Sequence, residues 1–347
     1  MNNKERGEKI RRQIVRDVKY HPSDIVRHIA QLFSITPQAV GNHIKRLEKE
    51  GYIESTGSRK GKRYFPGDIR DHSSYFKVSA DHDEYKLWRE QFSSVTEGLK
   101  ENVYDICQYG FTEMVNNVID HSGGEEFFVR IIRTSDNITI DVLDLGEGIF
   151  RRIKRLANLD DERESLLELS KGKFTTDPDN HSGEGIFFTS RAFDEFFIDS
   201  KGLQFTHDHE LVYDFLDVSE FGDGEEVGTH VFMKIARDSD RDLNSLYQEF
   251  GIGPEDYRFS RTIVPVRLAQ YDDDKLVSRS QAKRLLSGLE KFQNIILDFE
   301  GVPSVGQSFT DEIFRVYKLA HPEKILLATK MNHDVELMVN RVSNEGE

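Results

Sequence analysis

Apolar side chains recur about every fourth residue in three stretches of the first 50 residues, which is the spacing of one helix face. The residues of the three stripes are Ile10, Ile14, Val18, Ile25, Ile29, Phe33, Val40, Ile44 and Leu47. The pattern predicts one helix over residues 6–18 and a second that begins after an N-cap at Ser23. A third helix is expected to begin after Thr36, with Pro37 at its first position, and to end at Gly51.

Residues 52–65, YIESTGSRKGKRYF, indicate a strand, a basic glycine-containing tip and a second strand. This pattern predicts a β-hairpin whose loop is longer than two residues. Three helices followed by a hairpin resemble a winged helix-turn-helix domain over residues 5–66. Within it, ITPQAVGNHIKRLEKEGYI looks like the recognition helix and the first wing strand.

The resemblance implies double-stranded DNA as a partner. In such proteins the N-terminal end of the recognition helix meets base edges, and a basic wing contacts phosphates. The residues expected at the DNA are Gln38, Asn42, His43 and Lys45 on the helix, and Arg59, Lys60, Lys62 and Arg63 on the wing. The alternative is a winged helix for protein interaction, with a basic face that is simply solvated.

The pattern is less regular between residues 66 and 99. Turn-forming residues over 66–74 predict a short linker, whereas Tyr75, Phe76 and Trp88 are too apolar for a free tether. We therefore expect an arm that packs on the following domain.

A long helix is predicted over VYDICQYGFTEMVNNVIDH. Within it Glu113, Asn117 and His121 recur every four residues and therefore share one narrow face. An acid, an amide and an imidazole in line are unusual for a purely structural helix. Two strands, FFVRIIRT and NITIDVLDL, are predicted after it.

Glycine-containing motifs then follow in a fixed order: DLGEG at 144–148, GKFTTDP at 172–178, HSGEGIF at 181–187, and Gly228 and Thr229 before a strand. Each motif is weak alone, but together with ExxxNxxxH their order resembles the GHKL ATPase domain of gyrase, histidine kinases and MutL. The resemblance covers about residues 100–236 and is closest to histidine kinases and anti-sigma serine kinases. It implies a Bergerat α/β sandwich that binds ATP with Mg²⁺.

The resemblance also implies roles for single residues. Asn117 would give its amide oxygen to Mg²⁺, a hard cation that takes oxygen ligands, and Glu113 would act as a general base. Asp144 would accept the adenine amine, while Gly183 and Gly185 would hinge a lid whose helix amides face phosphate oxygens. The other residues expected at the nucleotide are His121, Gly146, Gly148, Lys173, Thr175, Thr176 and Thr229.

The sequence departs from the kinase pattern in three respects. The second glycine motif has Glu184, Ile186 and Phe187 where the family often has small and aliphatic residues. Asp177 stands where kinases of the FTT type usually have lysine, so Lys171, Lys173 or His181 would have to replace that phosphate contact. No phospho-acceptor helix hairpin precedes the domain, because the winged helix takes that place. Autophosphorylation on histidine in the usual two-component way is therefore not expected.

Strand and helix patterns alternate after Pro254, which predicts a small α/β layer. The segment ILDFEGVPSVGQSFTDEIF resembles the STAS domain of anti-sigma antagonists, and more closely its STAS-like variant, over about residues 260–342. The antagonists carry a serine at this junction that a GHKL kinase partner phosphorylates, and alignment puts Ser308 there. The alternative is that Ser308 caps the helix. The resemblance also implies a regulatory protein partner.

Composition excludes several classes of protein. The 347 residues are 37% hydrophobic and 31% charged, and no apolar run approaches the ~20 residues of a membrane span, so no membrane association is expected. The first residues carry no secretory signal, and the single cysteine, Cys107, excludes an internal disulfide framework and a Cys-rich zinc site. The cytoplasm is the expected compartment.

Charge is distributed unevenly along the chain. Residues 1–65 hold 15 Lys or Arg against 7 Asp or Glu, a net of +8, which leaves −23 for the rest of a chain whose total is −15. A basic head on an acidic body favours binding of an anionic polymer at the head.

The patterns together predict an α/β multidomain protein. Its expected parts are a winged helix at 1–70, a linker and packing arm at 71–99, a GHKL domain at 100–250 and a STAS-like domain at 255–347. The first functional hypothesis is a nucleotide-switched, DNA-binding transcriptional regulator, because it uses all three domains. The alternative is an anti-sigma-type protein serine kinase that acts on a STAS domain in cis or in trans. The sequence leaves open whether ATP is turned over and whether the chain forms a homodimer.

Overall fold

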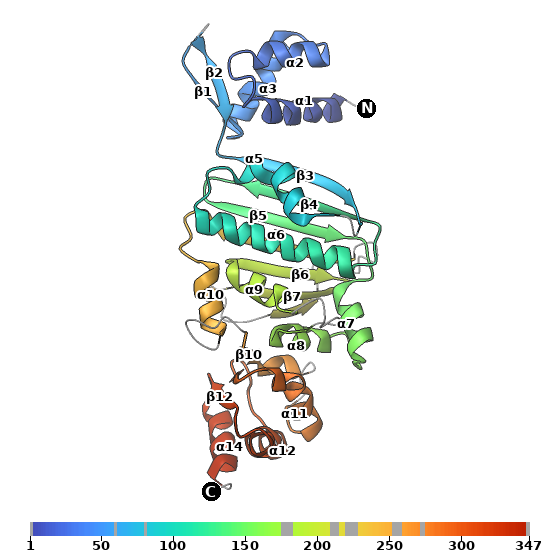
Figure 1. Ribbon diagram of the computed structural model, residues 1–347, viewed down its shortest axis with the longest axis vertical. Coiled ribbons are helices and arrows are strands. Elements are labelled where there is room, and N and C mark those ends of the chain that lie inside the picture. Colours follow the sequence, from blue (N-terminus) through green and yellow to red (C-terminus); the bar gives the residue numbers. More distant parts are fainter. Residues whose placement is uncertain are drawn as a thin grey trace.

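The protein is elongated, and its three domains follow one another along the long axis from the N-terminus to the C-terminus (Figure 1). The computed structural model describes residues 3–58, 61–79, 82–174, 183–208, 215–218, 228–251, 259–270 and 275–344.

The N-terminal domain contains the three helices and the hairpin that the sequence predicts. Its elements are α1 (Asn3–Asp17), α2 (Ile25–Phe33), α3 (Pro37–Lys49), β1 (Ile53–Thr56) and β2 (Arg63–Pro66). All nine residues of the apolar stripes pack together in one core. The N-cap of α3 is confirmed, since Thr36 Oγ1 accepts a hydrogen bond from the Ala39 amide at 3.2 Å. The N-cap predicted for α2 at Ser23 is wrong: Asp24 holds that position, and its side chain makes no capping bond.

A connection of three residues, 67–69, joins this domain to the next. The Gly67 amide donates to the Tyr52 carbonyl at 2.9 Å and the Ile69 amide to the Gly51 carbonyl at 3.1 Å, so the connection is tied to the base of the hairpin. The linker expected over residues 66–74 is therefore shorter than predicted. Residues 70–77 form a strand instead, because they pair along their whole length with the neighbouring strand of the middle domain.

The middle domain is an antiparallel sheet with helices on one face. The strand order is β3-β4-β5-β9-β6-β7-β8. The strands are β3 (Arg70–Lys77), β4 (Glu126–Arg133), β5 (Asn137–Asp144), β6 (Glu195–Ser200), β7 (Leu203–Asp208), β8 (Phe215–Val218) and β9 (His230–Ala236). The helices that follow the arm are α6 (Glu101–His121), α7 (Ile149–Ala157), α8 (Glu164–Lys171), α9 (Gly185–Ala192) and α10 (Leu243–Phe250).

Side chains alternate between the two faces of the sheet along each strand, and the apolar ones determine which face the helices cover. Val129, Ile131, Ile140 and Met233 point to the same side and pack against α6 in the largest core cluster. The arm before α6 completes this core with α4 (Glu84–Leu87), η2 (Trp88–Phe92) and α5 (Ser93–Thr96). Trp88 is fully buried, and its indole nitrogen donates to the Tyr104 hydroxyl at 3.0 Å.

The C-terminal domain is a small parallel sheet, β10-β11-β12, with helices packed against it. Parallel pairing requires a crossover between consecutive strands, and the helices supply it. The elements are β10 (Arg261–Pro265), η3 (Val266–Ala269), α11 (Arg279–Leu286), η4 (Leu289–Lys291), β11 (Asn294–Asp298), α12 (Gln307–Asp311), η5 (Glu312–Tyr317), α13 (Lys318–Ala320), β12 (Ile325–Thr329) and α14 (His333–Asn344). A capping box at Ser278 and Gln281 begins α11.

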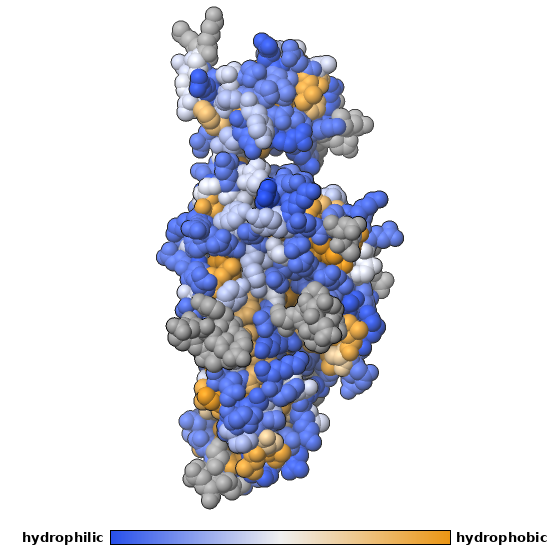
Figure 2. Space-filling view, viewed as in Figure 1, coloured by the Kyte–Doolittle hydropathy of each residue, from blue (hydrophilic) through white to orange (hydrophobic). Residues whose placement is uncertain are grey.

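The face in Figure 2 is mostly hydrophilic, with separate apolar patches and a narrow waist between the N-terminal and middle domains. Among the described residues, no helix combines the length and apolar content that crossing a bilayer requires.

Candidate functional site

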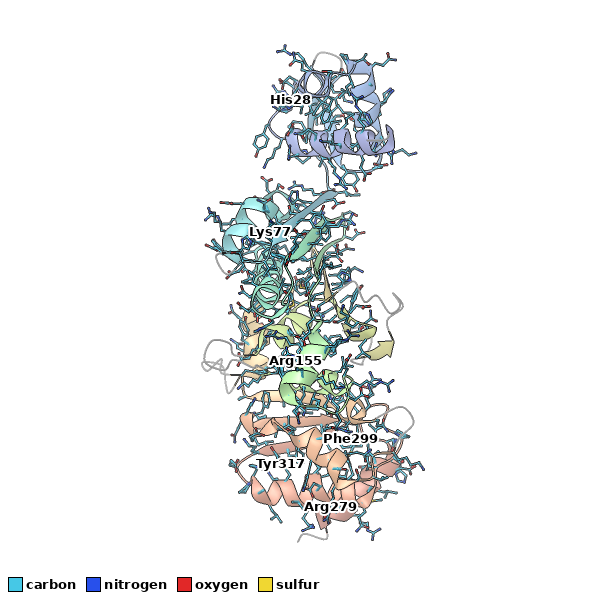
Figure 3. All side chains as sticks on the ribbon, turned by 90° about the vertical axis from the view of Figure 1, so that its right-hand side faces the viewer. His28, Lys77, Arg155, Arg279, Phe299 and Tyr317 are labelled. Atoms are coloured by element: carbon cyan, nitrogen blue, oxygen red, sulfur yellow. The ribbon has the colours of Figure 1, made fainter. Side chains whose placement is uncertain are left out.

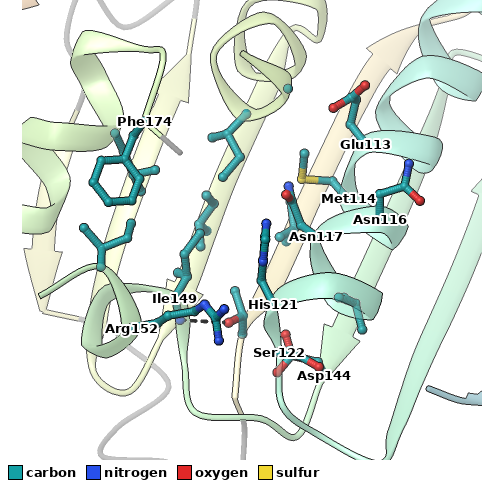
Figure 4. Close-up of a pocket in the computed structure, with 18 of the residues that line it drawn as sticks. Glu113, Met114, Asn116, Asn117, His121, Ser122, Asp144, Ile149, Arg152 and Phe174 are labelled. Atoms are coloured by element: carbon teal, nitrogen blue, oxygen red, sulfur yellow. Dashed lines mark hydrogen bonds between the residues drawn. The ribbon is translucent and has the colours of Figure 1, made fainter. Parts of the chain in front are cut away.

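A cavity of about 300 Å³ lies in the middle domain, between α6, α7 and the first residues of α9 (Figure 4). Residues of β5, β6 and β9 form its floor. The polar and charged side chains that line it are Glu113, Asn116, Asn117, His121, Ser122, Asp144, Arg152 and Thr229. Segments far apart in the sequence therefore meet around one space.

One face of α6 supplies one wall of the cavity. Glu113, Asn117 and His121 follow one another along the helix and all face the cavity (Figure 4), as their four-residue spacing requires. Phe111 and Val115, on the opposite side of the helix, are fully buried in the core. The apolar side thus fixes the orientation of the polar side.

Asp144 lies at the end of β5, at the bottom of the cavity, and its side chain is only 4% exposed. One carboxylate oxygen, Oδ1, accepts a hydrogen bond from the Gly146 amide at 2.7 Å. Burial raises the pKa of Asp144, and hydrogen bonds from Gly146 and Thr229 partly offset this rise. A carboxylate held in this way is a fixed hydrogen-bond acceptor with little contact to water.

Thr229 connects the floor of the cavity to α7. Its Oγ1 accepts a hydrogen bond from the Ile149 amide at 3.1 Å, and its carbonyl accepts one from the Asp144 amide at 2.9 Å. The glycine-threonine pair before β9 thus holds both Asp144 and the first turn of α7.

Glu113 lies against the first turn of α9. A Cβ atom placed on Gly185 would be 2.0 Å from Glu113 Oε2, so only glycine fits there with the carboxylate in this position. The N-terminal end of a helix carries partial positive charge and free amides, which favour an anion. Glu113 is therefore near the point where an anionic ligand would meet α9.

The sequence analysis missed Arg152 as a cavity residue. Ile149, Arg152, Ile153 and Leu156 all line the cavity and repeat at the spacing of one helix face. That periodicity was available in the sequence of α7, but it does not reveal which surface the helix covers. Asn116, Ser122 and Phe174 also line the cavity, although no motif in the sequence indicated them.

The expected nucleotide residues are distributed as follows. Glu113, Asn117, His121, Asp144, Gly148, Gly183, Gly185 and Thr229 line the cavity. Gly146 lies next to Asp144. Lys173 extends in another direction, with Nζ 5.3 Å from the ring centres of both Phe259 and Phe292. Thr175, Thr176 and His181 lie outside the described residues.

The donor set fits Mg²⁺ only as a partner of phosphate. Among the described residues, no group of three or more His, Cys, Asp or Glu side chains could hold a metal ion. Asn117 offers one amide oxygen to the cavity. Mg²⁺ commonly keeps several waters and binds through few protein ligands plus substrate phosphates, so this sparse set is compatible with a nucleotide-bound ion.

The expected DNA-facing residues of α3 divide into two groups. Gln38, Asn42 and Lys45 are exposed. His43 is half-buried beside α1, and burial together with Arg11 and Arg46 lowers its pKa. A neutral, half-buried imidazole is a weaker candidate for contact with DNA than the three exposed side chains.

The basic residues of the hairpin also differ in how available their charges are. Arg63 is exposed, whereas Lys62 Nζ is 3.0 Å from Glu48 Oε1 and its charge is thereby compensated. Arg59 and Lys60 lie outside the described residues.

Ser308 is exposed and is the second residue of α12. The N-cap of that helix is Gly306, so the helix-capping alternative for Ser308 is wrong. Arg279, which pairs with Asp311 of α12 at 3.5 Å, lies at the end of the C-terminal domain that is remote from the middle domain (Figure 3). Helix α12 therefore lies toward the end of the C-terminal domain that is remote from the cavity.

Three family models match the chain in sequence order. Residues 14–63 match the MarR family, residues 78–206 the histidine kinase-like ATPase domain, and residues 281–336 a STAS-like domain of unknown function. No curated protein matches the chain.

Proposed function

We propose that this chain, which joins a MarR-like winged helix, a histidine kinase-like ATPase domain and a STAS-like domain, is a DNA-binding transcriptional regulator controlled by ATP. The observation that carries the proposal is the cavity at which Asn117, Asp144 and the start of α9 meet. The amide oxygen of Asn117 suits Mg²⁺, the buried acceptor of Asp144 suits the adenine amine, and the helix N-terminus suits the phosphates.

Each part of the nucleotide then has a partner. The buried carboxylate of Asp144 would accept a hydrogen bond from the adenine amine. Amides at Gly183 and Gly185 would face phosphate oxygens, and Arg152 would add positive charge. Mg²⁺, bound through Asn117 and the phosphates, would neutralise phosphate charge.

The alternative proposal, a protein serine kinase, rests on Glu113. A carboxylate in the cavity could orient or deprotonate an attacking hydroxyl. Transfer in cis is disfavoured, since Ser308 belongs to the same short helix as Asp311, whose partner Arg279 lies at the end of the C-terminal domain remote from the middle domain. Transfer to a separate STAS protein is the remaining form of this alternative.

The DNA arm of the proposal rests on the exposed Gln38, Asn42 and Lys45 of α3 and on the +8 charge of residues 1–65. Gln38 and Asn42 are near the N-terminal end of α3, the end of a recognition helix that meets base edges of double-stranded DNA. The STAS-like domain would bind a regulatory protein. A homodimer would suit a two-fold symmetric operator.

Calorimetric titration with ATP and Mg²⁺ tests the proposal. Asn117→Ala should weaken binding at least tenfold while circular dichroism stays unchanged. Asn244→Ala, an exposed position on α10, is the matched control and should bind as the wild type does. Equal affinity in Asn117→Ala and wild type contradicts the site. Incubation with ATP labelled at the γ-phosphate separates the alternatives, because label on protein indicates a kinase.

A further inference from the structure

Helices α8 and α9 each face two parts of the molecule. Leu169 of α8 and Ile186 of α9 line the nucleotide cavity. Leu167 of α8 and Phe187 and Phe188 of α9 belong instead to the hydrophobic cluster of the C-terminal domain. The same two helices therefore form a wall of the cavity and the seat of the C-terminal domain.

Lys171, the last residue of α8, is the centre of this seat and is 2% exposed. Its Nζ donates to the carbonyls of Arg284 at 3.1 Å and Ser287 at 2.9 Å, at the C-terminal end of α11, and to Glu168 Oε1 at 2.6 Å. The Lys171 carbonyl in turn accepts a hydrogen bond from Thr262 Oγ1 at 2.7 Å. A cation at a helix C-terminus is electrostatically favoured, so Lys171 caps α11 from the other domain.

Arg284 makes the reciprocal contact. Its Nη1 is 2.9 Å from Glu164 Oε1, at the start of α8, and that glutamate is 6% exposed. Both ends of α8 are thus bound to α11 through contacts in which Glu164 and Lys171 are buried, and buried charges are screened little by salt.

Residues 171–174 run from the seat to the cavity. Gly172 has φ +76°, and a Cβ there would lie 2.7 Å from the Phe259 ring and 2.9 Å from the Phe187 ring. Lys173 extends over Phe259, and Phe174 then lines the cavity. Phe187 and Phe259 themselves pack with ring centres 4.4 Å apart. A displacement of the C-terminal domain would therefore move residues 172–174 at the wall of the cavity.

We propose that Lys171 is a positioning residue through which the STAS-like domain holds α8 and residues 172–174 at the wall of the nucleotide cavity, so that nucleotide binding and docking of this domain favour each other. This inference rests on the proposed function, because it requires a nucleotide in the cavity. Coupling between two sites is reciprocal: the docked domain raises nucleotide affinity, and the nucleotide stabilises the docked domain.

Lys171→Met in the full chain tests the inference, because methionine keeps an apolar stem of similar length while removing the three donors. Nucleotide affinity should fall by about fivefold or more, the lower end of typical coupling. Lys283→Met is the matched control, since Lys283 is an exposed lysine of α11 and should leave affinity unchanged.

Hydrogen exchange separates positioning from simple loss of stability. In the wild type, ATP with Mg²⁺ should protect amides of α11 although that helix does not line the cavity. In Lys171→Met, protection should persist at α6 and disappear at α11. If that variant does not fold, Thr262→Val, which removes one hydroxyl donor, should show the same two effects at smaller size.

The outcomes separate a failure of the proposed coupling from a failure of the proposed nucleotide binding. Wild type that binds no nucleotide overturns both. Wild-type affinity and unchanged α11 protection in a folded Lys171→Met or Thr262→Val overturn the coupling alone, while the nucleotide site stands.

Discussion

The carboxylate of Glu113 occupies the space that a side chain at Gly185 would need, with Oε2 2.0 Å from the position of the missing Cβ. The two residues come from different helices, α6 and α9, and are 72 positions apart in the sequence. The general-base candidate and the helix that would meet the phosphates are thus in direct contact.

Gly185→Ala should therefore change function more than stability. The methyl group meets the far end of a flexible side chain, so the carboxylate can rotate away, and the free energy of unfolding should fall by less than the roughly 1–3 kcal/mol that overpacking typically costs. Turnover should fall because Glu113 is displaced. Gly41→Ala, which adds a methyl group with no atom within 4 Å, is the control in chemical denaturation and ATPase assays. A large loss of stability in Gly185→Ala contradicts the prediction.

Glu113→Gln should lower the rate constant of any ATP hydrolysis or phosphate transfer by about 10²–10⁴-fold, because a general base acts mainly in the transition state. The dissociation constant for ATP with Mg²⁺ should stay within a few-fold of wild type. Single-turnover kinetics and calorimetry measure the two quantities separately. Loss of nucleotide binding instead would make the carboxylate structural. Absence of turnover in the wild type would identify the domain as a nucleotide sensor.

Asp144→Asn should abolish nucleotide binding without destabilising the free protein. Burial raises the pKa of Asp144 in the folded state above its ordinary value of 3.8, so the folded protein binds this proton more tightly than the unfolded chain. Stability is consequently lost as pH rises from that ordinary value through the raised pKa. The neutral amide avoids this penalty and keeps an acceptor oxygen for Gly146.

Thermal denaturation between pH 4 and pH 7 tests this pH dependence. The melting temperature of Asp144→Asn relative to wild type should increase toward pH 7. A melting temperature below that of wild type at pH 7 would show that the charge itself stabilises the fold.

DNA binding should weaken in different ways when a charged side chain at the phosphates is lost and when a side chain at the base edges is lost. Lys45→Ala or Arg63→Ala should lower affinity for all duplexes and reduce the slope of log K against log salt by about one per lost phosphate contact. Gln38→Ala should instead change the preference between sequences. Fluorescence anisotropy at several salt concentrations measures both effects.

Lys77→Ala is the control for charge, because Lys77 is an exposed lysine of the middle domain (Figure 3). A loss of affinity in Lys77→Ala as large as in Lys45→Ala would indicate a general charge effect. No binding by wild type at low salt would make the N-terminal domain a protein-docking module.

Local features of this chain were predictable from sequence. The three-domain order is confirmed by the family matches. The shared face of Glu113, Asn117 and His121 and the cap at Thr36 depend on a few neighbouring residues. Helix geometry fixes such relationships before any tertiary contact forms.

Features that depend on packing between distant segments were not predictable in this way. Lys171 and Lys173 were candidates for a missing phosphate contact, yet they extend to α11 and to Phe259 because the C-terminal domain packs on α8. Strand β3 was expected to be partly linker, since its polar sequence RDHSSYFK gives little sign of the open edge of β4 that it pairs with.

The short connection at residues 67–69 constrains how operators would be organised. Three residues span at most about 10 Å, and two backbone hydrogen bonds already tie these residues to the hairpin. If two copies bind one duplex, contacts between their middle and C-terminal domains set the distance between the two recognition helices. A flexible tether does not set it. Such a protein should tolerate only one separation between half-sites. Insertion of five base pairs, which turns one half-site to the opposite face of the duplex, should abolish paired binding. Insertion of ten base pairs should not restore paired binding fully.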